Sequence, residues 1–240
     1  MVRYRKQALF LGLFLSLLMQ GCGMREGGLA PVEESTWYGT NPSIDSHVVK
    51  QGETLYSIAF RYDQDYHRLA ALNHLKSPYG LKIGQVLHIK STSSVENFAS
   101  DLVKALPRAP KLPLMAGKST WLWPAQGRVM RTFSPSNGRK GIDIAGKKGS
   151  KIRASSAGIV AYAGDGLPGY GHLVILKHDT EYLTAYGNNQ KILVHSGQYV
   201  KQGQVIAEMG VVNRRFWGVH FEVRRRGEPV NPLNYLKKKT

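Results

Sequence analysis

The sequence predicts a multidomain protein in which a small βααβ domain precedes a larger, mainly antiparallel β domain. The chain has 240 residues, 42% of them hydrophobic, which is enough for packed cores. Over residues 45–90 the apolar pattern changes from strand to helical spacing and back to strand. Beyond residue 120, β-rich segments are separated by glycines at short intervals.

Residues 1–21 have the pattern of a secretory signal peptide. A positively charged N-terminal segment precedes the apolar run 8–19, which is shorter than the roughly 20 residues needed to span a bilayer. Cys22, the only cysteine, follows, so an internal disulfide and a cysteine-cluster zinc site are excluded. Residues 18–22 resemble a bacterial lipobox, which implies a lipid on Cys22. Because Gly23 is not Asp, the resemblance implies the periplasmic face of the outer membrane; an uncleaved anchor or a buried thiol is the alternative.

The small domain is predicted at residues 45–90, between a flexible tether at 22–44 and a linker at 91–119. Its first helix should begin after the cap Thr54, because Leu55 and Ile58 start an i, i+3, i+4, i+7 pattern. Asp65 is the expected cap of the second helix. The expected strands are residues 47–50 and 85–89.

This stretch resembles a LysM domain, over residues 48–55, 58–59, 72–73 and 81–87. The resemblance implies binding of N-acetylglucosamine-containing glycans, here peptidoglycan. The implied glycan-binding residues are Gly52, Glu53, Thr54, Leu55, Ser77, Pro78 and Tyr79. Leu55 also fits a core position, Gly52 a turn, and Tyr79 either sugar stacking or an ordinary loop position.

The larger domain is expected at residues 120–237. Its predicted strands are residues 158–163, 173–177, 182–186, 204–207 and 219–223. The domain resembles LytM or lysostaphin-type zinc metallopeptidases, on the runs 141–145, 157–160, 169–171, 199–207 and 220–223. Active members of that family cut peptide cross-links in peptidoglycan.

The residues that the family uses for zinc and catalysis are only partly present. Asp143 and His220 match two of the three zinc ligands. Arg139, Asn188 and Gly218 stand where the family has histidines. A catalytic zinc takes three protein ligands, and a guanidinium has no lone pair for a metal. We therefore expect no catalytic residue, metal or cofactor, and expect Arg139 to pair with Asp143.

Other histidines do not rebuild a zinc site. His172 and His178 would lie on one face of an ideal strand but about 20 Å apart, too far to share a metal. We therefore expect structural roles for both.

The lipobox, LysM and degenerate LytM segments together resemble NlpD-type lipoproteins. That resemblance implies a peptidoglycan-binding protein that activates an N-acetylmuramoyl-L-alanine amidase at the division septum. The vacant cleft would contact the amidase. The cleft residues are expected to be Arg139, Asp143, Asn188, Arg214, Arg215, Gly218 and His220.

The charge balance leaves alternatives open. Lys and Arg number 33 against 16 for Asp and Glu, a net charge of +17. This charge fits a polyanion, but the export signal argues against nucleic acid and favours anionic peptidoglycan or lipid. The runs 214–215 and 224–226 fit either contacts to acidic groups or a solvated basic face. An active endopeptidase with atypical zinc ligands and a passive peptidoglycan-binding tether are the rival functions.

Overall fold

The structure is a computed structural model that describes residues 45–89 and 121–238. The predicted signal peptide, the lipidation site Cys22, the tether and the linker lie outside these residues. Both predicted domains belong to one structural unit of the chain, within residues 36–240. None of the helices in the described ranges has the length and apolarity that a membrane crossing needs.

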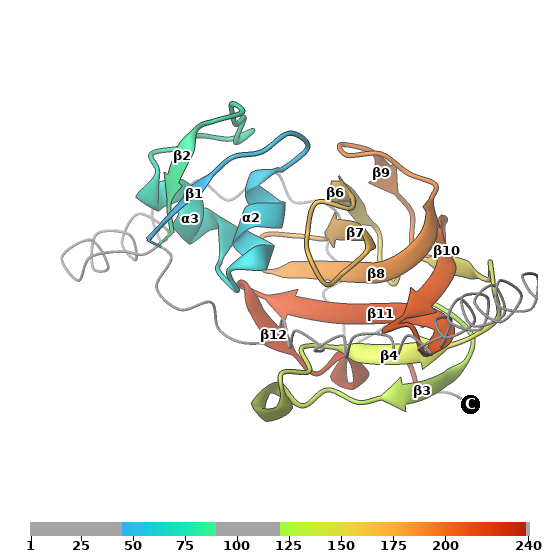
Figure 1. Cartoon of the computed structure of the whole chain (residues 1–240). Helices are drawn as coiled ribbons and strands as arrows, with labels where there is room; N and C mark the ends of the chain where they lie inside the picture. Colours follow the sequence, from blue (N-terminus) through green and yellow to red (C-terminus); the bar gives the residue numbers. More distant parts are fainter. Residues whose placement is uncertain (1–44, 90–120, 239–240) are drawn as a thin grey trace, which may run out of the picture. The chain divides into compact units, whose positions relative to one another are not determined.

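The small domain has the predicted βααβ order (Figure 1). It contains β1 (Ser46–Val48), α2 (Leu55–Arg61), α3 (Tyr66–Leu72) and β2 (Val86–His88). The two strands pair antiparallel, with His47 opposite Leu87. As predicted, Thr54 caps α2, in a capping box with Ser57, and Asp65 caps α3. Leu55 and Ile58 are in the core of this domain.

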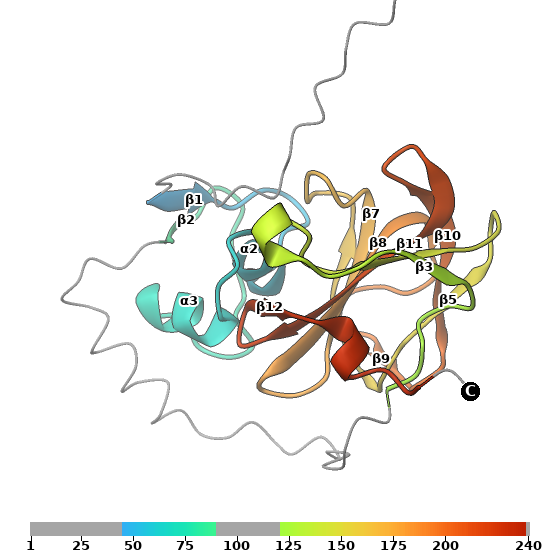
Figure 2. The same cartoon turned by 90° about the horizontal axis from the view of Figure 1, so that it is seen from below.

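The larger domain is a strongly curved antiparallel sheet, as Figure 2 shows from below. Its strands are β3 (Arg128–Arg131), β4 (Ile142–Ala145), β5 (Lys151–Arg153), β6 (Gly158–Gly164), β7 (His172–Lys177), β8 (Tyr182–Ile192), β9 (Tyr199–Val200), β10 (Val205–Val212), β11 (Phe216–Arg225) and β12 (Glu228–Val230). Short 3-10 turns lie at Pro135–Asn137 and Pro232–Asn234. The main strand order is β3-β4-β11-β10-β8-β7-β6-β9, with β5 on β10 and β12 on β11.

Strand β11 is the element that positions the site. It pairs with β4, β8 and β10, so it lies inside the sheet rather than at an edge. Its apolar residues Val219, Phe221 and Val223 are fully buried in the main core. Because side chains alternate along a strand, the intervening residues 220, 222 and 224 share the other face.

A second hydrophobic cluster joins the small domain to the sheet. Phe60, at the end of α2, is 2% exposed and packs with buried residues of the larger domain that include Leu173 and Ile175. Its ring meets Tyr170 edge-on, with centroids 5.3 Å apart. The Arg61 guanidinium donates to the carbonyl of Gly166 at 2.8 Å. The two domains therefore share part of their cores.

Candidate functional site: a chain of buried ion pairs and two grooves

The two matched ligand positions bind each other. Asp143 on β4 lies opposite His220 on β11 in the strand register. His220 Nδ1 is 2.6 Å from Asp143 Oδ1, and its Nε2 is 2.9 Å from Glu222 Oε1. Both ring nitrogens are thus engaged by carboxylates. Asp143 and His220 are 4% and 6% exposed, so neither presents a free surface.

The two carboxylates favour a charged imidazole at His220. Burial by itself would lower the pKa of His220, but the hydrogen bonds to Asp143 and Glu222 outweigh it and raise the pKa to about 9. Burial likewise would raise the pKa of Glu222, but Arg224 and His220 lower it to about 2. An imidazolium donates from both nitrogens and has no lone pair for a metal.

The charges continue along β11 into the small domain. Arg224 is fully buried, and its Nε donates to Glu222 Oε2 at 2.7 Å. Its Nη1 donates to Asp63 Oδ1 at 2.5 Å, and Lys140 also pairs with Asp63. The Phe60 ring covers the Arg224 guanidinium at 4.3 Å. We call this row the ion chain; its members are Asp143, His220, Glu222, Arg224, Asp63 and Lys140.

The structure corrects one expectation and argues against one of the two alternatives for the run 224–226. Arg139 does not pair with Asp143 in the described part of the chain; the nearer guanidinium is Arg131, whose Nε is 4.0 Å from Asp143 Oδ2. The basic run 224–226 is not one solvated face either, because Arg224 is buried. Its neighbours Arg225 and Arg226 both pair with Glu181.

The residues present do not suit a catalytic zinc. Among residues 45–89 and 121–238, no group of His, Cys, Asp or Glu side chains has metal-binding geometry. Arg139, which the sequence match is expected to place at a ligand position, is a permanent cation whose Nε is buried without a hydrogen-bond partner among the described residues. His178 is held by the Ala157 carbonyl and Thr184 Oγ1, and burial lowers its pKa, so it has the expected structural role.

Gly218 has a packing role in this sheet. It is buried in β11 opposite Ala145 of β4. A Cβ at Gly218 would lie 2.4 Å from the carbonyl oxygen of Ile144. The close approach of the two strands therefore requires a glycine, and the backbone of β4 fills the space that a histidine would need.

Accessible cleft residues gather at the opposite end of β11 from Arg224. A shallow hollow of about 240 Å³, here the hairpin pocket, is lined by Gly171, Asn188, Asn189, Gln190, Gly210, Val211 and Trp217. Asn188 has a left-handed backbone (φ 60°), and its N–H donates to the Tyr170 carbonyl. The exposed Arg214 and Arg215 lie in the turn that joins β10 to β11, beyond Val211 and Trp217. Lys148 lies over the Trp217 ring.

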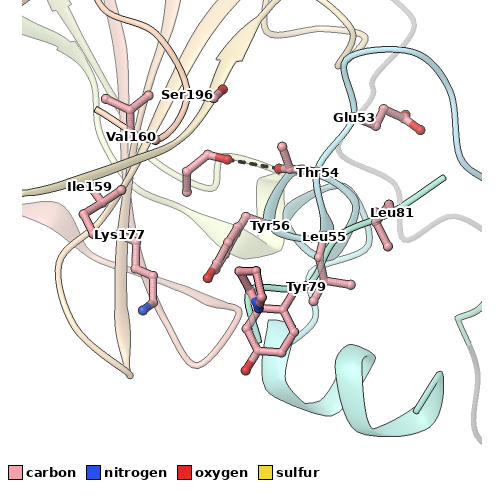
Figure 3. A pocket seen from close by; sticks show the side chains of 14 residues that line it. Glu53, Thr54, Leu55, Tyr56, Tyr79, Leu81, Ile159, Val160, Lys177 and Ser196 are labelled. Carbon is pink, nitrogen blue, oxygen red and sulfur yellow. Dashed lines mark hydrogen bonds between the residues drawn. The ribbon is translucent and has the colours of Figure 1, made fainter. Parts of the chain in front are cut away.

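The predicted glycan segments line a larger groove of about 420 Å³ (Figure 3). Glu53, Thr54, Leu55, Pro78 and Tyr79 contribute to it, whereas Gly52 and Ser77 do not. We call it the junction groove, because the larger domain supplies its other wall. Residues that the sequence did not predict for it are Tyr56, Gly80, Leu81, Ile159, Val160, Ala161, Lys177, Ser196 and Gly197.

Two of the predicted glycan residues are engaged within the protein. The Glu53 carboxylate is 3% exposed and binds His47, the Lys50 N–H and Arg61. Thr54 Oγ1 accepts from the Ser57 N–H and donates to the Ala161 carbonyl. These contacts fix the turn at the start of α2 and leave the backbone and the aromatic rings to meet a ligand.

Comparison with known proteins agrees with this architecture. Residues 47–90 match the LysM domain, and residues 137–232 match peptidase family M23. A lipoprotein NlpD/LppB homolog from Pseudomonas aeruginosa is 37% identical, over 96% of this chain and 92% of that protein. The murein hydrolase activator NlpD of Escherichia coli is 33% identical, over 83% of this chain and 70% of that protein. A putative M23 peptidase structure from Pseudomonas aeruginosa is 23% identical with a TM-score of 0.46, covering 63% of this chain and 66% of that one.

The fold and the matches define a class of protein that joins a LysM domain to an M23-peptidase-type β domain. Two relatives carry the names lipoprotein NlpD/LppB homolog and murein hydrolase activator NlpD. The chain belongs to the NlpD/LppB family of lipoproteins. This membership supports a role at peptidoglycan and a membrane-anchored place in the cell envelope.

Proposed function

We propose that this protein binds peptidoglycan from the periplasmic face of the outer membrane and activates an N-acetylmuramoyl-L-alanine amidase during septal wall splitting. In this proposal the M23 domain is not itself a hydrolase. The observation that carries the proposal is His220, whose two ring nitrogens are both bound by carboxylates. The sequence expectation that Arg139 replaces a zinc-binding histidine agrees with it. A zinc ion there would have to displace the ion chain.

The hairpin pocket is the surface that we propose for the amidase. Asp143 and His220 are buried and bound to each other, so they support the cleft without contacting a partner. Trp217 and Asn188 instead line an accessible hollow, and Arg214 is exposed in the adjacent turn. An aromatic side chain beside an exposed arginine is a common composition for an interface centre.

Activation requires that the protein bind the active amidase better than the inactive one. The proposed inactive form, implied by the family, has a helix over its zinc site. While the active fraction is small, each tenfold gain in that fraction needs about 1.4 kcal/mol of differential binding. A single aromatic side chain that the partner buries, such as Trp217, can supply this amount.

The test is dye release from labelled peptidoglycan by the full chain, with and without a periplasmic amidase from the same cell. We expect no release by the protein alone and strong release with both. Zinc content of the purified protein is measured in parallel. Chelator-sensitive release by the protein alone, with stoichiometric zinc, would instead show an active peptidase.

The passive tether predicts a different pattern in the same assay. It gives peptidoglycan binding with no gain in amidase-dependent release. Trp217→Ala serves as the internal variant, because it changes the hairpin pocket and leaves the junction groove intact. An amidase response that is equal for wild type and variant would exclude the hairpin pocket as the contact.

A further inference from the structure

The junction groove has walls from both domains. One wall is the start of α2 and the loop before β2, which carry Tyr56 and Tyr79. The other wall consists of β6, the end of β7 and the loop between β8 and β9. Figure 3 shows Lys177, at the end of β7, across the groove from the two tyrosines. The predicted glycan segments therefore form only half of the site.

The two walls are fixed to each other by contacts at the groove and beside it. Thr54 Oγ1 donates to the Ala161 carbonyl at 3.0 Å, a bond drawn in Figure 3. Phe60, four residues along α2 from Tyr56, is buried against the sheet. The ion pair between Asp63 and Arg224 adds a buried electrostatic contact. A ligand in the groove thus meets a preformed site.

The chemistry of the small-domain wall suits a sugar. Tyr56, Tyr66 and Tyr79 form an aromatic cluster, with ring centroids 4.6 to 6.3 Å apart. Tyr56 and Tyr79 line the groove, whereas Tyr66 is 5% exposed behind them. Rings of this kind present apolar surface beside a hydroxyl group that can hydrogen-bond.

The chemistry of the other wall suits an anion. Lys177 is half-buried, and its Nζ lies 5.7 Å from the centre of the Tyr66 ring. In the described part of the chain it forms no ion pair with a carboxylate. Burial lowers the pKa of Lys177 against the opposing influence of Asp179. Glu53, the other ionisable carboxyl or amine on the lining, already pairs with Arg61 and hydrogen-bonds to His47.

We propose that the M23 domain forms the second wall of the glycan groove and that Lys177 binds the lactyl carboxylate of a muramic acid residue in the strand. This inference rests on the proposed peptidoglycan binding. The carboxylate must be attached directly to a sugar, because Lys177 faces the rings on which the sugar would stack. That carboxylate is free only after water has cleaved the lactyl amide, which releases the stem peptide with its new amino group. The groove would therefore prefer the product of an amidase.

The test compares three glycans for binding to the full chain at fixed ionic strength. They are strands with free lactyl carboxylates, strands that retain stem peptides, and N-acetylglucosamine oligomers without carboxylates. For Lys177→Met we expect about tenfold or greater loss of affinity for the first glycan only. Lys177→Arg should retain most of that affinity. The exposed Lys201, changed to Met, is the matched control and should alter none of the three.

Three results would overturn the inference. Equal loss for all three glycans would mean that Lys177 supports the shape of the groove. Loss of affinity only for strands with stem peptides would mean that Lys177 binds a carboxylate of the peptide and not the lactyl carboxylate. Unchanged affinity of Lys177→Met for the free-carboxylate strands would mean that Lys177 does not bind the glycan. Failure of the wild type to bind any of the glycans would instead refute the proposed peptidoglycan binding, and amidase-dependent dye release tests activation separately.

Discussion

Replacing Asp63 by Ala should destabilise the larger domain, although Asp63 belongs to the smaller one. Arg224 is fully buried and bonds to Asp63, Glu222 and the Gly227 carbonyl. Removing one partner of a buried pair typically costs about 3–5 kcal/mol. Asp63 is 24% exposed and Arg224 keeps its other partners, so we expect about 2–3 kcal/mol. Asp63→Asn keeps an oxygen acceptor and should cost about half as much.

Urea unfolding followed by tryptophan fluorescence measures this effect. The described tryptophans, Trp121, Trp123 and Trp217, all lie in the larger domain, so they report the effect at a distance. Asp165→Ala, at an exposed position, is the matched control and should stay within about 0.5 kcal/mol. A fluorescence transition unchanged by Asp63→Ala would refute the argument that the ion chain couples the two domains.

Further changes test other parts of the site. The raised pKa of His220, about 9, means that its contribution to stability is full below about pH 6.5 and is lost as the pH rises through 9. The free energy of unfolding, measured by urea titration at each pH, should fall over that range by on the order of 3 kcal/mol. A flat profile would contradict the charged imidazole. Gly218→Ala should lower the free energy of unfolding by at least about 2 kcal/mol, because its Cβ would meet the Ile144 carbonyl at 2.4 Å. Calorimetry measures this effect, and an unchanged melting temperature would show that β4 can move aside. Trp217→Ala should reduce amidase-dependent dye release about tenfold while peptidoglycan pull-down stays constant; joint loss of both would point to misfolding.

Local chemistry predicted most of the fold. The caps Thr54 and Asp65 begin the helices where the sequence placed them, because a side-chain oxygen at the cap satisfies free N–H groups. The long apolar strands were found from their composition, although β8 and β11 extend further than expected. The short strands β3, β4, β5, β9 and β12 were not predicted, since two to four residues carry too little pattern.

The site was harder than the fold to predict from the sequence. Asp63 and Arg224 are 161 residues apart, and no local pattern relates them. A partial signal was present in β11, where His220, Glu222 and Arg224 alternate with apolar residues and so share one face. The second wall of the junction groove had no signal, because Lys177 and Ser196 come from a different domain than the LysM segments that the resemblance identified.

The buried pair of Asp63 and Arg224 bears on how this protein can be re-engineered. Here a donor LysM domain without a carboxylate at the position of Asp63 would leave the Arg224 charge short of one counter-charge inside the protein. A transplant that ignores this residue would therefore disturb the recipient β domain as well as the glycan preference. A swap that keeps the end of α2 and the turn after it, residues 60–64, would preserve the contacts of Phe60 and Asp63 with the β domain.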